Sequence, residues 1–316
     1  MSVIIRHLDL SGGRPISGDK FRAIAPRRSI AIDGYIPEAT WFDAVGLHAN
    51  FNHHEGSNRL ATRCTAAQIL LNIRMGGFSS FFDERAPVHV FYNDCDPDVI
   101  MSLWILENAA RVQCVRNPIV NKMVHLLDML DSTSATYPFP ADLDLGTYEW
   151  VFDPYFDAQK CGVIDRKNPK DYELIIEECF ARIERYLAGT PGRVAIDMTF
   201  DTIGLYKGWG MFHPHGSLSR MAIVGQGHFA FVLVRQRDCG RFVYVLQRTC
   251  EGVHFPLIKF YDVLNAVEGQ FELWGGCDII GGSPRVLGSR IPPEKLAEIL
   301  NSVMAMSTTS ASIGLI

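Results

Sequence analysis

The stretch Asn93-Asp94-Cys95-Asp96-Pro97-Asp98 runs directly into Val99-Ile100-Met101-Ser102-Leu103-Trp104-Ile105-Leu106. Residues 87–92, just before it, are apolar and partly β-branched, which predicts a buried strand. The apolar run that follows predicts a helix. Three carboxylates therefore lie in the turn at the C-terminal end of a strand, where open α/β sheets place their ligands.

The three acids of this turn, Asp94, Asp96 and Asp98, repel one another when they are ionised. A divalent metal is the simplest partner for them, because hard cations take oxygen ligands. Alternatively, Asp96 or Asp98 caps the helix and the other acids are solvated, since Asp is an ordinary N-cap residue. Both interpretations fit this stretch alone.

Two more predicted strands end in side chains that bind metals. The strand predicted over 47–51 runs into Asn52-His53-His54-Glu55, and the strand predicted over 29–34 contains Asp33 near its end. If the strand predicted over 47–51 continues through His53 and His54, these adjacent side chains point to opposite sides of the sheet. One histidine could then bind a metal while the other faces substrate. Three strand ends of one parallel sheet would thus present ligands on the same edge.

Helical spacing predicts crossover helices between these strands. One helix is predicted from about residue 62 to 75, and another over 118–131 ends with Asp128 and Asp131 one turn apart. Strands alternating with helices predict a parallel sheet. Residues 137–170 are rich in Pro and Asp and are predicted to be loop.

The second half of the chain has a different pattern. An amphipathic helix over 171–187 is followed by the breakers Gly189-Thr190-Pro191-Gly192, a candidate domain boundary. Strands are predicted over 194–200, 221–224, 228–236 and 241–247, with a hairpin at 237–240 and a last helix over 293–304. We therefore expect an α/β protein with a parallel-sheet N-terminal domain (1–170), a linker helix (171–190) and a smaller α+β C-terminal domain (191–316).

Composition narrows the partners and the compartment. The chain has 316 residues, of which 47% are hydrophobic and 21% charged, and a formal net charge of −5, which argues against long nucleic acids. The eight cysteines form no CxxC pair and the N-terminal residues lack a signal-peptide core, so we expect free thiols and a cytoplasmic protein. No run approaches the ~20 apolar residues of a membrane span. The oligomeric state is not predicted.

With these motifs in place, the chain resembles the DHH phosphoesterase superfamily. Asn52-His53-His54 is similar to the Asp-His-His motif, and Asp96-Pro97-Asp98 with Ser102 is similar to the Asp-x-Asp-x-x-x-Ser motif. Asp33 resembles the lone strand-end Asp that precedes Asp-His-His, and Asp131-Ser132-Thr133 resembles the last metal-binding Asp. Two departures are that the Asp-x-Asp motif follows the His-His motif, which needs a reordered first domain, and that Asn52 carries no charge.

A glycine-rich stretch near the C-terminus extends the resemblance to the second domain. Trp274-Gly275-Gly276, Gly281-Gly282-Ser283-Pro284-Arg285 and Gly288-Ser289 are similar to the Gly-rich segment of the family's accessory substrate-binding domain. Gly permits close backbone approach to an anion, and Arg285 could bind phosphate bidentately. The alternative is a turn-rich connection before the last helix.

The resemblance implies two divalent metals, typically Mn²⁺, and hydrolysis of a phosphoester or phosphoanhydride in a small molecule or short nucleotide. The implied metal ligands are Asp33, His53, Asp96, Asp98 and Asp131, with Asp33 as the bridging candidate and Asp128 as the alternative to Asp131. Asp94 and His48 are weaker candidates. The implied catalytic residues are His54 and Arg285, with His54 facing the phosphate, and the implied substrate residues are Gly281, Gly282, Ser283 and Arg285.

Two other functions remain open on the sequence. Asn52 and the reordered motifs favour a non-catalytic ligand-binding or regulatory relative of the same fold. Retention of Asp33, both histidines, Asp96 and Asp98 together favours the hydrolase, since a site without cations has no reason to keep acids that repel. Metals at such a site could also serve a carboxylate or amide substrate, because metal type alone does not fix the reaction.

Overall fold

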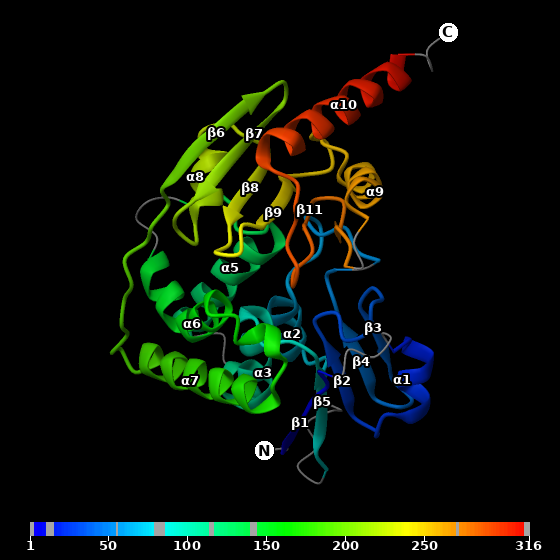
Figure 1. Cartoon of the computed structure of the whole chain (residues 1–316). Helices are drawn as coiled ribbons and strands as arrows, with labels where there is room; N and C mark the ends of the chain where they lie inside the picture. Colours follow the sequence, from blue (N-terminus) through cyan, green and yellow to red (C-terminus); the bar gives the residue numbers. More distant parts are fainter. Residues whose placement is uncertain are drawn as a thin grey trace. The chain divides into compact units, whose positions relative to one another are not determined.

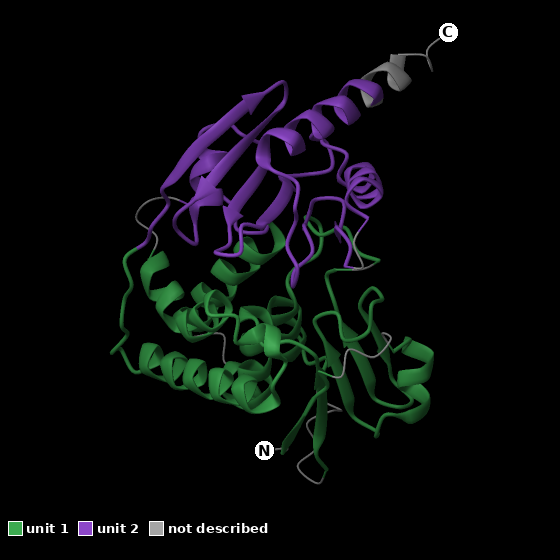
Figure 2. Cartoon of the chain, viewed as in Figure 1, with its two compact units in different colours: residues 1–133, 142–195 green, residues 134–141, 196–316 purple. Residues whose placement is uncertain are grey.

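The computed structural model describes residues 3–10, 16–54, 56–78, 86–113, 117–139, 144–269 and 272–312, with the backbone alone for 307–312. The chain is mixed α/β and divides into two compact units, each with its own sheet (Figure 2). Unit 1 comprises Met1–Thr133 and Asp142–Ala195, and unit 2 comprises Ser134–Ala141 and Ile196–Ile316. Among the described helices, none is both long and apolar enough to span a membrane.

The sheet of unit 1 is largely parallel, as the alternation of strands and helices predicts. Its order is β1-β5-β2-β4-β3, and only the edge strand β3 is antiparallel to its neighbour. The strands are β1 (Ile4–Leu8), β2 (Ser29–Ile32), β3 (Trp41–Asp43), β4 (His48–Phe51) and β5 (Val88–Tyr92). The predicted strands at 29–34, 47–51 and 87–92 are confirmed as β2, β4 and β5.

Helices cover both faces of this sheet (Figure 1). The described helical segments of unit 1 are α1 (Gly18–Ile24), α2 (Thr65–Arg74), α3 (Pro97–Glu107), α4 (Ala109–Val112), α5 (Pro118–Ser132), α6 (Leu145–Lys160), the 3-10 turn η1 (Ile164–Arg166) and α7 (Pro169–Leu187). On the face of α1, Ala31 packs in a cluster with Phe21 and Phe91. Because side chains alternate along a strand, the buried Ile30 and Ile32 project to the opposite face.

The prediction of a loop over 137–170 is wrong, because α6 occupies residues 145–160. The side chain of Asp144 caps this helix by accepting a hydrogen bond from Thr147 N. Tyr148, Phe152 and Tyr155 are buried and follow one another at the three- and four-residue spacing of a helix face. This apolar stripe outweighs the breaker signal of Pro154, which lies inside the helix.

Unit 2 contains a six-stranded sheet in the order β10-β11-β9-β8-β7-β6. Its strands are β6 (Phe200–Tyr206), β7 (Trp209–Pro214), β8 (Ala230–Gln236), β9 (Phe242–Arg248), β10 (Gly275–Gly276) and β11 (Ile280–Gly282). All neighbouring strands are antiparallel except β7 and β8. The predicted hairpin at 237–240 joins β8 to β9.

The helices in the described part of unit 2 are α8 (Ser219–Gly225), α9 (Leu257–Glu268) and α10 (Pro293–Ser312). Phe260 of α9 and Leu300 of α10 share the larger apolar cluster with Val232 of β8. Ile223 of α8 packs against Leu233, whose side chain projects from the other face of β8. The strand predicted over 221–224 is wrong, because these residues lie in α8; an apolar run this short does not separate helix from strand.

The order of strands in unit 1 brings the motif-bearing ends together. β2 and β4 are parallel neighbours with Ile32 in register with Phe51, so Asp33 and Asn52 leave the sheet at the same edge. β5 pairs with the other side of β2 and also ends at this edge. The expected convergence of three strand ends is therefore present.

Candidate metal centre

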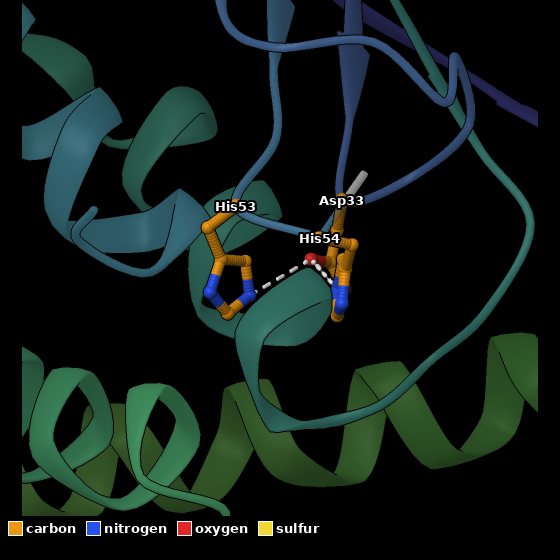
Figure 3. Close-up of side chains that lie close together, drawn as sticks. All are labelled: Asp33, His53 and His54. Carbon is orange, nitrogen blue, oxygen red and sulfur yellow. Dashed lines mark hydrogen bonds and ion pairs between the residues drawn. The ribbon is translucent and has the colours of Figure 1, made fainter. Parts of the chain in front are cut away.

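Asp33 follows β2 in a tight turn and lies between two imidazole rings (Figure 3). Its backbone is left-handed, with φ 49°, and Gly34 follows with φ 77°. The carboxylate Oδ1 lies 2.9 Å from His54 Nε2, 3.5 Å from His53 Nε2 and 3.3 Å from the donating hydroxyl of Thr65. A left-handed backbone conformation, which Asp adopts more readily than most residues, thus aims this carboxylate at both histidines.

His53 is the centre of the cluster. Its ring is fully buried, and Nε2 lies 2.9 Å from Asp131 Oδ2, 3.5 Å from Asp33 Oδ1 and 3.6 Å from Asp98 Oδ2. Although these atoms are close, neither ring nitrogen of His53, nor Oδ2 of Asp131, makes a hydrogen bond of good geometry to the described residues. Buried polar atoms normally have a hydrogen-bond partner or a metal partner, so these atoms mark a candidate binding site.

Two overlapping groups of side chains could hold a cation. Asp33, His53 and His54 form one, and His53, Asp98 and Asp131 form the other; within each group the ligand atoms all lie within 4.8 Å of one another. Imidazole nitrogen and carboxylate oxygen are ligands of divalent transition metals. The structure therefore brings buried Asp and His groups into positions that suit a metal.

Asp98 has a second role that the sequence did not reveal. Its two oxygens accept hydrogen bonds of 2.7 Å from Thr65 N and Ala66 N in the first turn of α2. The N-cap residue of α2, Cys64, supplies no side-chain cap, and its own N–H donates to Asp128 Oδ1 at 2.7 Å. Carboxylates from α3 and α5 thus cap α2, and its N-terminal partial charge stabilises them.

The remaining acids are used in local structure. Asp96 caps α3, since its Oδ1 accepts from Asp98 N and Val99 N at 3.0 Å each, as the capping interpretation anticipated. Asp94 Oδ1 accepts from Cys95 N at 2.6 Å. Neither acid belongs to the convergent groups, nor does Asp128. A ligand role for Asp96 stays a prediction, and Asp131 is favoured over Asp128.

Arg59 is the member of the site that the sequence analysis missed. Its Nη2 donates to Asp131 Oδ1 at 2.8 Å, and Nη1 lies 3.1 Å from His54 Nδ1. Because a guanidinium can only donate, His54 Nδ1 is the acceptor and the proton of the neutral ring is on Nε2, which then donates to Asp33. The only signal was a basic residue five positions after His54, which does not reveal the contact.

The charges of the cluster divide between its members. Burial opposes ionisation of Asp33, but the neighbouring imidazoles of His53 and His54 outweigh it and lower the pKa of this carboxyl. Burial and the carboxylates of Asp33 and Asp131 raise the pKa of Asp98. Burial also disfavours the charged form of His53, but the Asp131 carboxylate overrides it and raises the pKa of His53 to about 11. Without a metal, a proton on His53 neutralises part of the acid charge.

Asn52, at the position where the motif that this stretch resembles has Asp, forms hydrogen bonds within the loop and not with the cluster. It is fully buried; Nδ2 donates to Glu38 O at 2.9 Å and Oδ1 accepts from His54 N at 3.0 Å. An Asp here would replace the donor with a charged acceptor that faces a carbonyl. The amide is therefore the side chain that this loop requires.

The predicted substrate residues of unit 2 have structural partners. Ser283 is buried, and its hydroxyl accepts from Tyr244 N at 3.0 Å; Gly281 and Gly282 pair in β11, and a Cβ on Gly281 would meet the Tyr261 hydroxyl. The side chain of Arg285 is exposed, and its carbonyl accepts from Arg237. Substrate binding by Gly281, Gly282, Ser283 and Arg285 stays a prediction, as does a catalytic role for Arg285.

His48, the weaker ligand candidate, lies apart from the convergent groups. Its Nε2 is 3.1 Å from Pro26 O, and its Nδ1 is 3.5 Å from Asp43 Oδ2. The candidate metal centre thus consists of residues of unit 1 that follow β2 and β4 or lie at the start of α3 and the end of α5. No family model, curated protein or solved structure matches the chain.

Proposed function

We propose that the chain is a metal-dependent hydrolase of phosphoester or phosphoanhydride bonds, acting on a small phosphate-bearing molecule or a short nucleotide. The observation that supports it is the surrounding of His53: its Nε2 lies within 3.6 Å of three carboxylates and makes no hydrogen bond of good geometry within the described chain. Such an arrangement is costly without a cation and favourable with one.

The donor set fits divalent metals that accept both oxygen and imidazole, of which Mn²⁺ is the one that we propose. His53, Asp98 and Asp131 would hold one ion. Asp33, which lies near His53 and His54, is the candidate to bridge to a second ion. Two divalent ions would supply positive charge for the phosphoryl group and lower the pKa of the attacking water.

The residues around the cluster have complementary roles in this proposal. The side chain of His54 is 30% exposed, against 0% for His53 and 4% for Asp33, so His54 is the imidazole that can reach a substrate. In this role its Nε2–H would turn from Asp33 to a phosphate oxygen, while Nδ1 continues to accept from Arg59. Arg59 orients the His54 ring through a hydrogen bond to Nδ1. It also binds Oδ1 of Asp131, whose other oxygen, Oδ2, lies toward His53.

A second candidate function is ligand binding without catalysis. Arg59 supports it, because the guanidinium already neutralises one oxygen of Asp131 and so competes with a metal for this carboxylate. Asn52 supports it as well, because the amide adds no charge to the site. In this alternative the fold and the acids would bind a ligand but hydrolyse it poorly.

Elemental analysis separates these functions. Protein purified without chelator and incubated with Mn²⁺ would be compared with His53→Ala, and with His125→Ala at an exposed position of α5 as the matched control. We expect near-stoichiometric metal in wild type and control, metal loss in His53→Ala, and metal-dependent hydrolysis of phosphomonoesters, phosphodiesters or pyrophosphate. Wild type without metal would contradict the proposal, and metal without hydrolysis would favour the alternative.

A further inference from the structure

Unit 2 contains a half-buried guanidinium that has no carboxylate partner within the described chain. Arg220 lies in α8, and its one hydrogen bond to the described residues runs from Nη1 to the carbonyl of Ser134 at 3.3 Å. A guanidinium has five N–H donors, so most of the capacity of Arg220 is unused. Charges that are partly removed from water are normally paired, because leaving one unpaired is unfavourable.

A second arginine increases the local positive charge. Leu233 of β8 packs with Ile223 of α8, so the odd-numbered residues of β8 face α8. Arg235 continues that row at the exposed end of the strand, and Arg220 lies one helical turn from Ile223. Burial and the nearby Arg235 lower the pKa of Arg220 to about 10, which is the direction expected for a cation without a counter-ion.

Polar groups of Ser134 complete the surroundings of Arg220. The carbonyl of Ser134 also accepts from Gln247 Nε2 at 3.3 Å, so two donors already occupy it. The Ser134 hydroxyl is buried and has no hydrogen-bond partner among the described residues. Ser134 and Ala135 are both left-handed, with φ 52° and 61°, an uncommon conformation for two successive residues other than Gly.

We propose that Arg220, Arg235 and Ser134 form an anion site in unit 2 that binds a phosphate group. The guanidinium of Arg220 offers the paired N–H groups that match two phosphate oxygens, Arg235 adds charge from the strand, and the Ser134 hydroxyl can donate. The site differs from the glycine-rich residues 281–285 and from the metal centre. It requires no metal, so it holds whether or not the chain is a hydrolase.

The test uses the full chain treated with chelator and inorganic phosphate as the probe, titrated calorimetrically at constant ionic strength. Wild type would be compared with Arg220→Gln and with Arg290→Gln, which removes an exposed arginine of the same unit. Loss of charge-assisted hydrogen bonds predicts a Kd for phosphate about 10-fold or more higher in Arg220→Gln, with no change in Arg290→Gln. Arg220→Lys should keep part of the affinity for phosphate, because lysine keeps the positive charge but lacks the paired N–H donors of the guanidinium.

Thermal unfolding supplies a second measurement and a check on folding. Phosphate should raise the Tm of wild type and of Arg290→Gln but not that of Arg220→Gln. If Arg220→Gln does not fold, Arg235→Gln takes its place and should weaken phosphate binding several-fold. Binding of phosphate to Arg220→Gln, or to Arg235→Gln in its place, with wild-type affinity would overturn the proposal. The absence of saturable phosphate binding to wild type would also overturn the proposal. Any remaining phosphate association would then be non-specific.

Discussion

Nε2 of His53 and Oδ2 of Asp131 lie 2.9 Å apart, yet neither atom makes a hydrogen bond of good geometry within the described part of the chain. Two atoms at this distance usually share a proton along the line between them. Here they are misaligned, and the carboxylates of Asp33 and Asp98 approach the same nitrogen. The nitrogen and the carboxylate oxygens thus converge without mutual alignment, an arrangement that suits a metal ion.

Asp98→Asn and Asp128→Asn should separate helix capping from metal binding. Both carboxylates accept backbone N–H groups at the start of α2, at 2.7 Å, but only Asp98 belongs to a convergent group. We expect each variant to lower the free energy of unfolding by about 1–3 kcal/mol, as for a lost cap or buried hydrogen bond. Urea unfolding measures this effect.

Metal content then distinguishes the two variants. Asp98→Asn replaces a charged ligand by an amide and should lose metal, whereas Asp128→Asn should retain it. Equal metal content in both would show that Asp98 acts as a cap alone, and equal loss in both would show that an intact α2 N-terminus is what the metal requires.

Arg59→Lys should change the hydrogen bonding of His54 without unfolding the protein. The guanidinium reaches His54 Nδ1, Asp131 Oδ1 and Asp131 O together, which a lysine ammonium cannot reproduce. We expect the wild-type ring to carry its proton on Nε2 and the variant to show a mixture of tautomers. Nitrogen-15 NMR of the imidazoles measures this ratio directly.

Arg63→Lys is the matched control for that measurement. The Arg63 side chain is 63% exposed and lies 3.6 Å from Asp128, so its contribution should be small. The His54 tautomer should stay as in wild type. If Arg59→Lys also leaves the tautomer unchanged, Arg59 does not position this ring.

How far the sequence predicts this site depends on the range of the contact. Asp33 and His53 were predictable, because buried strands with clear apolar runs end directly before each motif and parallel strands end at one edge. The caps on α2 were not, since Asp98 and Thr65 are 33 residues apart and no local pattern links them. The same holds for Arg59 and Asp131, separated by 72 residues.

Helix α6 and helix α8 were missed for different reasons. In α6 the Pro and Asp residues gave strong local signals for a loop, and the buried face of Tyr148, Phe152 and Tyr155 overrode them. In α8 the apolar run was too short for its periodicity to be seen. The unpaired charge of Arg220 depends on the placement of α8 against β8, so it could not be inferred before the fold.

A half-buried histidine pair in unit 1 should make a contribution to stability that is lost in weak acid. His7 Nε2 lies 2.8 Å from His89 Nδ1 on adjacent strands, and His7 stacks on Phe91. Burial and the neighbouring His89 lower the pKa of His7 below its usual value of about 6.5. The folded state thus binds fewer protons than the unfolded one, so this stability is present above pH ~6.5 and is lost as the pH falls below it.

Urea unfolding between pH 8 and pH 5 checks that direction. On acidification the free energy of unfolding of His7→Gln should change less unfavourably than that of wild type, and His125→Gln, at an exposed site, should follow wild type. If the free energy of unfolding of His7→Gln depends on pH as in wild type, groups other than His7 control the response to acid.

Asn52→Asp tests whether the amide of this motif is structural. The substitution introduces the acid of the motif that this stretch resembles, but it replaces the Nδ2 that donates to Glu38 O at 2.9 Å with a carboxylate oxygen. A buried acceptor would then face a carbonyl, so the free energy of unfolding should fall by about 1–3 kcal/mol. Asn58→Asp, at an exposed position of the same loop, is the control and should have little effect. If Asn52→Asp instead gains metal affinity at unchanged stability, the loop accommodates an acid at this position. The amide of Asn52 would then not be a structural requirement of the loop.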